Sequence, residues 1–226
     1  MATIDREVQT VSRLTDLQDS VTRIFFALPT SKGFYLAGGG AMLVNNLSPR
    51  PTTDLDFFGY VSQEEVAALS DDFEKAIRAR GWKIERVRIL PTFARFLITT
   101  DEEDLFIDFA HDSRPILEAV QTDVGPSLHP EEIAGRKMCA LFGRALARDF
   151  VDVFLLQENF GIELMITRAR EIDRGFSLTY LVELIFRLNS MTDTELKIDP
   201  TRIPELRRFF SGWALEIVSE RMQLTA

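Results

Sequence analysis

The sequence predicts an α+β fold, in which an N-terminal lobe around a small mixed sheet precedes a C-terminal helical lobe. Short β-rich runs alternate with helical patterns over the first half of the chain, whereas the pattern is helical from residue 115 onward. A chain of 226 residues can bury a sizeable core. We expect the boundary near Gly125, which gives a lobe over 1–125 and a helical lobe over 126–226.

The elements follow from apolar spacing and from start and stop signals. Ser62 and Glu65 form a capping-box pattern at the start of a helix that Gly81 ends. The other expected helices cover residues 5–28, 40–47, 115–120, 131–145, 148–158, 163–174, 177–188 and 203–221. The expected strands cover residues 34–37, 54–58, 83–90, 93–99 and 105–110.

A pair of carboxylates in a predicted strand is the most informative feature of the chain. Asp54 and Asp56 flank Leu55, so both carboxylates point to one face of the strand while Leu55 points into the core. Neighbouring carboxylates repel each other unless a cation lies between them. Hard oxygen ligands suit Mg²⁺ or Mn²⁺. Asp54 and Asp56 are therefore predicted metal ligands.

A glycine triplet precedes this pair. Gly38, Gly39 and Gly40 follow the strand at 34–37, where they let the backbone approach a ligand closely, and the helix that begins there directs free N–H groups at an anion. Alone, such a triplet is more often a turn, and an Asp-x-Asp motif alone often occurs in turns and caps. Their order on strand, turn, helix and strand favours a metal-dependent phosphoryl or nucleotidyl transfer site.

A third carboxylate lies in a later apolar strand. The runs 93–99 and 105–110 are joined by an acidic linker and read as a hairpin. Leu105 and Phe109 share one face of the second run, and Asp108 lies on the other. Burying an uncompensated carboxylate is costly. We interpret Asp108 as a third metal ligand, and the alternative is a solvated residue on an edge strand.

These motifs resemble a known family. Gly38-Gly39, a short helix, an Arg-x-Thr-x-Asp-Leu-Asp-Phe run from Arg50 to Phe57 and a later strand Asp resemble the polymerase-β-type nucleotidyltransferase superfamily. More narrowly, the chain is similar to the AbiEii/AbiGii toxin family of abortive-infection and toxin–antitoxin systems. The resemblance covers about residues 34–157. The residues that match the narrower family are Lys137, Arg144, Arg148, Asp149 and Asp152.

The resemblance implies a reaction. A nucleoside triphosphate (NTP) would be attacked in line at its α-phosphorus, and the nucleoside monophosphate would move to an RNA (tRNA) or protein acceptor. Asp54, Asp56 and Asp108 would hold two ions, with Asp108 also placed to accept the acceptor's proton. Lys137 would neutralise charge on the triphosphate. A cognate antitoxin is the partner that the family implies.

Arg50 and Asp152 have weaker predicted roles in binding the nucleotide. Arg50 would contact phosphate, although a solvated side chain is equally compatible with the pattern. Asp152 would orient Lys137 or touch the base or ribose, and the alternative is a surface ion pair with Arg148.

One residue departs from the superfamily pattern. Gly40 stands where Ser or Thr is common, which removes one hydroxyl contact to the triphosphate. The departure keeps open a catalytically inactive nucleotide-binding module of the same fold. A second alternative is a nucleotidyltransferase that acts on a small molecule.

Composition limits the possible partners. The net charge of −9 argues against broad binding to nucleic acid, although a basic stretch at residues 136–148 permits a local groove. No apolar run approaches the length of a membrane span, and the N-terminal segment lacks an apolar signal core. We therefore expect a cytoplasmic protein with no membrane partner.

Overall fold

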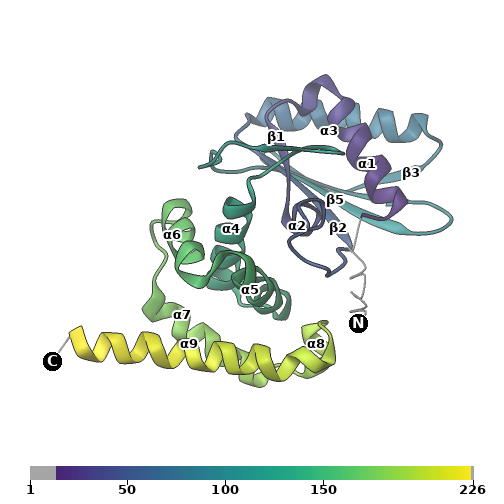
Figure 1. Ribbon diagram of the computed structural model, residues 1–226. Helices are drawn as coiled ribbons and strands as arrows, with labels where there is room; N and C mark the ends of the chain where they lie inside the picture. Colours follow the sequence, from purple (N-terminus) through teal and green to yellow (C-terminus); the bar gives the residue numbers. More distant parts are fainter. Residues whose placement is uncertain (1–13, 225–226) are drawn as a thin grey trace, which may run out of the picture.

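The first helix lies against the sheet. A computed structural model describes residues 14–224 of the chain (Figure 1). Helix α1 spans Asp16–Ala27, and Thr15 caps its first turn. The amphipathic helix expected over residues 5–28 is confirmed over α1, and the expected part at residues 5–13 lies outside the described residues.

In this part of the chain, seven strands form one mixed sheet in the order β3-β4-β5-β2-β1-β7-β6. β2 runs parallel to β5 and β1 to β7, whereas the other neighbours are antiparallel. A mixed sheet combined with helices confirms the predicted α+β class. The strands are β1 Phe34–Ala37, β2 Asp54–Gly59, β3 Lys83–Leu90, β4 Phe93–Thr99, β5 Asp104–His111, β6 Val120–Thr122 and β7 Gly125–Ser127.

The helix expected over residues 115–120 is wrong. This segment is irregular and leads into β6, which the sequence did not predict. The Glu132 carboxylate accepts hydrogen bonds from the backbone N–H groups of Ile116 and Leu117, at 2.9 and 3.1 Å. A buried side chain of the helical half therefore anchors the segment, and these amides do not depend on helix formation for partners.

One face of the sheet packs against α1 and α3, where α3 spans Gln63–Ala79 (Figure 1). Phe57 of β2 stacks on Phe25 of α1 with ring centroids 3.7 Å apart. Phe109 of β5 meets Phe73 of α3 edge-on at 5.0 Å. Because side chains alternate along a strand, this aromatic core turns the residues between the buried ones to the opposite face.

The start and stop signals of α3 are confirmed. Ser62 and Glu65 form the predicted capping box, with each side chain bonded to the other's backbone N–H. The helix ends before Gly81, whose φ of +81° lies in the left-handed region that favours glycine.

The helices of the second half lie on the other side of the sheet from α1 and α3 (Figure 1). The helices expected there are confirmed to within a few residues, except that the one at 177–188 ends as an α-helix at Ile185 and continues as a 3₁₀ helix. No helix in the described part of the chain has the length and apolar character to cross a membrane. These helices are α4 Pro130–Arg144, α5 Ala147–Phe160, α6 Ile162–Ile172, α7 Leu178–Ile185, α8 Asp193–Leu196 and α9 Ile203–Leu224.

The division into lobes 1–125 and 126–226 stays a prediction. β7 pairs with β1 through Leu36 and Ser127, so the sheet extends past the expected boundary. Helix α4 then begins at Pro130, where the chain leaves the sheet for the helical half.

Candidate active site

A cavity of about 1080 Å³ lies between the sheet and the helices of the second half. The ends of β1 and β2, the middle of β4 and β5, and residues of α4, α5 and α8 line it. The predicted site residues in its lining are Gly38, Gly39, Arg50, Asp54, Asp56, Asp108 and Lys137. Gly40 and Asp152 are not part of the lining.

The three predicted metal ligands lie on neighbouring strands. The parallel register of β2 and β5 places Asp56 directly beside Asp108, and Asp54 lies two residues earlier on the same face of β2. Leu55 is fully buried on the other face, as predicted. Parallel pairing of β2 with β5 therefore brings together carboxylates that are far apart in the sequence.

The electrostatic environment of Asp56 is unfavourable for a charged carboxylate. Burial raises the pKa of Asp56 from its ordinary value of 3.8 to about 6, and the charges of Asp54 and Asp108 act in the same direction. Lys137 and Arg148 oppose this effect without cancelling it. Repulsion among the carboxylates thus remains, as expected for a site built to receive positive charge.

The glycine turn is shaped around these carboxylates. Helix α2 spans Gly38–Val44 and begins two residues earlier than predicted. A Cβ atom on Gly38 would lie 1.8 Å from Oδ2 of Asp56, and one on Gly39 would lie 2.5 Å from Oγ1 of Thr52. The Thr52 hydroxyl in turn donates a 2.8 Å hydrogen bond to Oδ1 of Asp54. Both glycines are required by close approach, and Thr52 orients the first carboxylate.

Gly40 does not belong to the cavity. A Cβ atom at this position would lie 2.9 Å from Leu55 and 3.2 Å from Leu36, both of which are core residues. A side chain at this position would therefore lie against the core of this chain, while the predicted role of the Gly40 backbone in nucleotide binding stays a prediction. The absence of Ser or Thr at position 40 therefore removes no contact to a phosphate in the cavity.

Arg95 is a site residue that the sequence reasoning missed. Its Nε and Nη2 donate to the two carboxylate oxygens of Asp108, at 2.7 and 2.5 Å. Among the described residues, no three His, Cys, Asp or Glu side chains are arranged as a metal cluster. Asp108 lies beside Asp56 on the neighbouring strand, but both of its oxygens are bound to Arg95. A charged residue in the apolar run of β4, opposite Asp108 in the hairpin, was the available signal.

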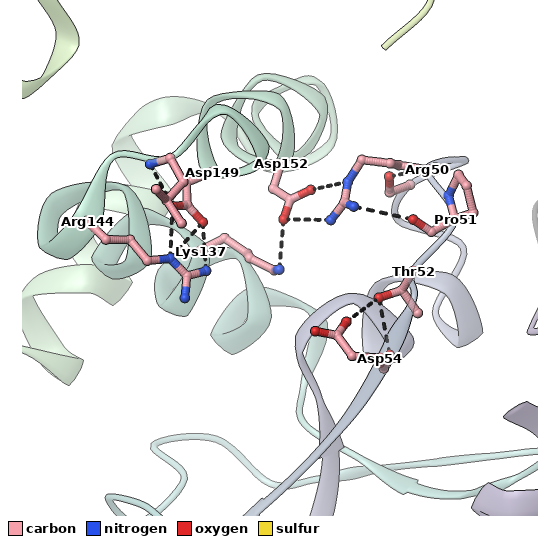
Figure 2. A network of polar contacts seen from close by, with 10 residues as sticks. Arg50, Pro51, Thr52, Asp54, Lys137, Arg144, Asp149 and Asp152 are labelled. Carbon is pink, nitrogen blue, oxygen red and sulfur yellow. Dashed lines mark hydrogen bonds and ion pairs between the residues drawn. The ribbon is translucent and has the colours of Figure 1, made fainter. Parts of the chain in front are cut away.

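Asp152 links the two halves of the chain (Figure 2). Its carboxylate accepts a 2.8 Å hydrogen bond from Lys137 of α4 and two, at 2.9 and 3.2 Å, from Arg50 of the loop before β2. The side chain of Asp152 is fully buried. Although burial alone would raise the pKa of Asp152, the charges of Lys137 and Arg50 hold it below its ordinary value.

This network decides between the alternatives for Asp152. A surface ion pair with Arg148 is excluded, because Asp152 is buried and bonded to Lys137 and Arg50. Asp152 orients Lys137, as one of the two predictions stated, and it lies behind the cavity wall rather than in it. Arg144 is held in a similar way by Asp149, at 2.8 Å (Figure 2).

Cations of the helical half form the wall opposite the carboxylates. The basic stretch at 136–148 was expected to permit a local groove, and its four cations all line the cavity. Lys197, which follows α8, lines the same space. The cavity therefore combines a carboxylate face with a cationic face in a chain whose net charge is −9. The four cations are Arg136, Lys137, Arg144 and Arg148.

Solved structures place this architecture in the class of nucleotidyltransferase folds. A putative nucleotidyltransferase from Helicobacter pylori is 18% identical, with a TM-score of 0.58 over 93% of this chain and 99% of that one. The nucleotidyltransferase toxin MenT4 (Rv2826c) from Mycobacterium tuberculosis is 16% identical, with a TM-score of 0.56 over 88% and 86%. JHP933 from Helicobacter pylori is 17% identical, with a TM-score of 0.52 over 94% and 100%.

The sequence itself defines the family. Residues 22–212 match the family described as nucleotidyl transferase AbiEii toxin of the type IV toxin–antitoxin system. The chain therefore belongs to the AbiEii nucleotidyltransferase toxin family, as its motifs predicted. No curated protein matches the chain.

Proposed function

We propose that this chain transfers a nucleoside monophosphate from an NTP to an RNA or protein acceptor, as the toxin of a toxin–antitoxin pair with a cognate antitoxin. The observation that carries the proposal is one cavity with Asp54, Asp56 and Asp108 on one side and Lys137 with its neighbouring arginines on the other. A triphosphate needs both faces. The cations bind its oxygens, while the carboxylates would hold the divalent cations at the reacting phosphorus. The cytoplasmic location stays a prediction.

The residues of this chain have distinct roles in the proposed reaction. The backbone turn at Gly38 and Gly39 passes close to the carboxylates, and its free N–H groups would bind phosphate. Buried Asp152 orients Lys137. The fixed positive charge of Lys137 stabilises the negative charge that develops on the departing pyrophosphate. Asp108 is placed beside Asp56 to accept the proton of the attacking hydroxyl.

The donor set fits a hard divalent cation. Asp54 and Asp56 offer carboxylate oxygens on one face, and the raised pKa of Asp56 reflects burial and like charge that a cation would offset. Asp108 on the next strand completes the set. Mg²⁺ or Mn²⁺ held there would supply charge neutralisation at the transferring phosphorus. All three side chains lie in or beside the cavity lined by the glycine turn.

Two alternatives are less well supported. An inactive module had the missing hydroxyl at Gly40 as its only support, and a side chain at that position would face the core rather than the cavity. A small-molecule acceptor would leave the cationic wall, which includes Arg144, Arg148 and Lys197, largely unused beyond the triphosphate. A polyanionic acceptor uses it more fully.

The direct test is to incubate the protein with labelled NTPs, Mg²⁺ or Mn²⁺ and a cell extract, and to identify what becomes labelled. We expect label in RNA or in a protein, and none with Asp56→Ala. Calorimetry adds a second measurement, because Asp56→Ala should abolish metal-dependent nucleotide binding. Label in a small molecule would support the alternative acceptor. Unchanged ternary binding by Asp56→Ala would overturn the metal assignment.

A further inference from the structure

Arg95 binds one of the predicted metal ligands, Asp108, through two hydrogen bonds. It lies directly opposite Asp108 in the β4–β5 hairpin, and its guanidinium donates a hydrogen bond to each carboxylate oxygen. Such paired, charge-assisted hydrogen bonds fix orientation as well as distance. The side chain of Asp108 is only 8% exposed, whereas that of Arg95 is 41% exposed. The carboxylate is thus fixed in the wall, while the guanidinium has open space on its far side.

Two aromatic rings flank this guanidinium. The Arg95 guanidinium carbon lies 6.0 Å from the ring centroid of Phe93 and 5.7 Å from that of Phe106. Both distances are within the range of cation–π attraction. Phe106 is 39% exposed, so this apolar surface faces solvent beside the cavity. The rings already contact the guanidinium while it is bound to Asp108, so these contacts do not depend on the carboxylate.

A divalent cation and Arg95 require the same oxygen atoms of Asp108. We propose that Arg95 is a positioning residue that competes with the divalent cation for Asp108, holding this carboxylate in the metal-free protein and releasing it when the cation binds. The inference rests on the metal-dependent reaction proposed above. On release, the guanidinium turns toward its exposed side and stays beside Phe93 and Phe106, which flank it already.

The test is a calorimetric titration of the nucleotide-free protein with Mn²⁺, comparing wild type with Arg95→Gln. Removing the competitor should tighten Mn²⁺ binding about tenfold, as expected for the loss of a pair of charge-assisted hydrogen bonds to the same carboxylate. The matched control is Arg88→Gln. Arg88 pairs with Arg95 across β3 and β4, is exposed and does not line the cavity, so its loss removes one nearby charge without freeing Asp108.

A second readout does not depend on binding heats. Without metal, Arg95→Gln should melt at a lower temperature than wild type, because Asp108 loses its counter-ion. Mn²⁺ should then raise its melting temperature by more than it raises that of wild type. Arg95→Lys keeps the charge but loses the paired geometry, and it should bind Mn²⁺ with intermediate affinity. This variant replaces Arg95→Gln if the latter does not fold.

The outcomes separate this inference from the proposed function. Mn²⁺ binding by Arg95→Gln that is equal to or weaker than that of Arg88→Gln would overturn the competition, provided that Asp56→Ala loses binding. Equal Mn²⁺ affinity in wild type and Asp56→Ala would instead overturn the metal-dependent function and the inference with it. Tighter binding by Arg95→Gln alone supports both.

Discussion

Asp56 occupies the space that a side chain on Gly38 would need. A Cβ atom built on Gly38 lies 1.8 Å from Oδ2 of Asp56, and the φ of Gly38 is +57°. The positive φ comes from the turn between β1 and α2, and the short distance comes from pairing of Ala37 with Asp56 across β1 and β2. A side chain at position 38 would therefore displace the Asp56 carboxylate, so the glycine turn and the position of this carboxylate are coupled.

Gly38→Ala should inactivate the protein. The added methyl group displaces the Asp56 carboxylate and is strained at a positive φ, so both activity and stability should fall. We expect transfer below detection and a loss of about 1–3 kcal/mol in the free energy of unfolding. Denaturant titration and the labelled-nucleotide assay measure the two effects.

Gly143→Ala is the matched control for this substitution. Gly143 lies in α4, is exposed, and a Cβ atom there would meet nothing within 4 Å. Alanine in a helix interior is more favourable than glycine, so this variant should gain about 0.5–1 kcal/mol and stay active. Full activity of Gly38→Ala would show that the Asp56 position is not required for transfer.

Asp56 should give the metal-free protein a distinct pH dependence. Its pKa is about 6 in the folded chain and 3.8 when unperturbed, so the folded state binds more protons between these pH values. Stability from this group is therefore highest at low pH and falls by about 3 kcal/mol as the pH rises from about 4 to about 6, with no further change above.

Asp56→Asn isolates this contribution. The asparagine does not titrate in this range, so its stability advantage over wild type should grow between pH 4 and pH 6, while carboxylates remote from position 56 contribute equally to both proteins. Denaturant titrations at several pH values measure the difference. Mn²⁺ should reduce this difference in stability, because a bound cation offsets the repulsion of Asp56 by Asp54 and Asp108. A constant difference across this range would mean that Asp56 titrates normally.

The sequence predicted the carboxylates but not all of their contacts. Alternation along β2 and β5 correctly separated Leu55 from Asp54, and Phe109 from Asp108. The parallel pairing of β2 with β5 was not predictable, because residues 60–103 intervene and nothing local specifies the neighbour. The contact of Arg95 with Asp108 could have been predicted from the sequence, because a hairpin between β4 and β5 places these two residues opposite each other.

Two other discrepancies have a physical cause beyond local pattern. The missing hydroxyl at Gly40 was interpreted through the family motif as a lost phosphate contact, but a Cβ atom at this position would face Leu36 and Leu55. The segment after Pro115 has apolar spacing compatible with a helix. Its amides are bound by Glu132, a residue of α4 that lies close only after the chain has folded.

Asp152→Asn should destabilise the protein strongly. Asp152 is fully buried between Lys137 and Arg50, and the substitution leaves both cations facing a neutral amide. Removing one member of a buried ionic network typically costs about 3–5 kcal/mol. Denaturant titration at neutral pH measures this loss. A loss below about 1 kcal/mol would be the value for a surface pair and would contradict the role of Asp152 in linking the two halves.

Lys137→Ala should impair turnover more than folding. Asp152 keeps its two hydrogen bonds from Arg50 in this variant, so the stability loss should be smaller than for Asp152→Asn. Lys137 faces the cavity, where charge builds on the departing pyrophosphate, so kcat at saturating nucleotide should fall about 10²-fold or more. The control is Arg80→Ala, an exposed residue after α3 and outside the cavity lining, which should leave kcat unchanged. If Lys137→Ala keeps full kcat while Asp56→Ala is inactive, Lys137 only balances the charge of Asp152, and the cationic wall acts through its arginines.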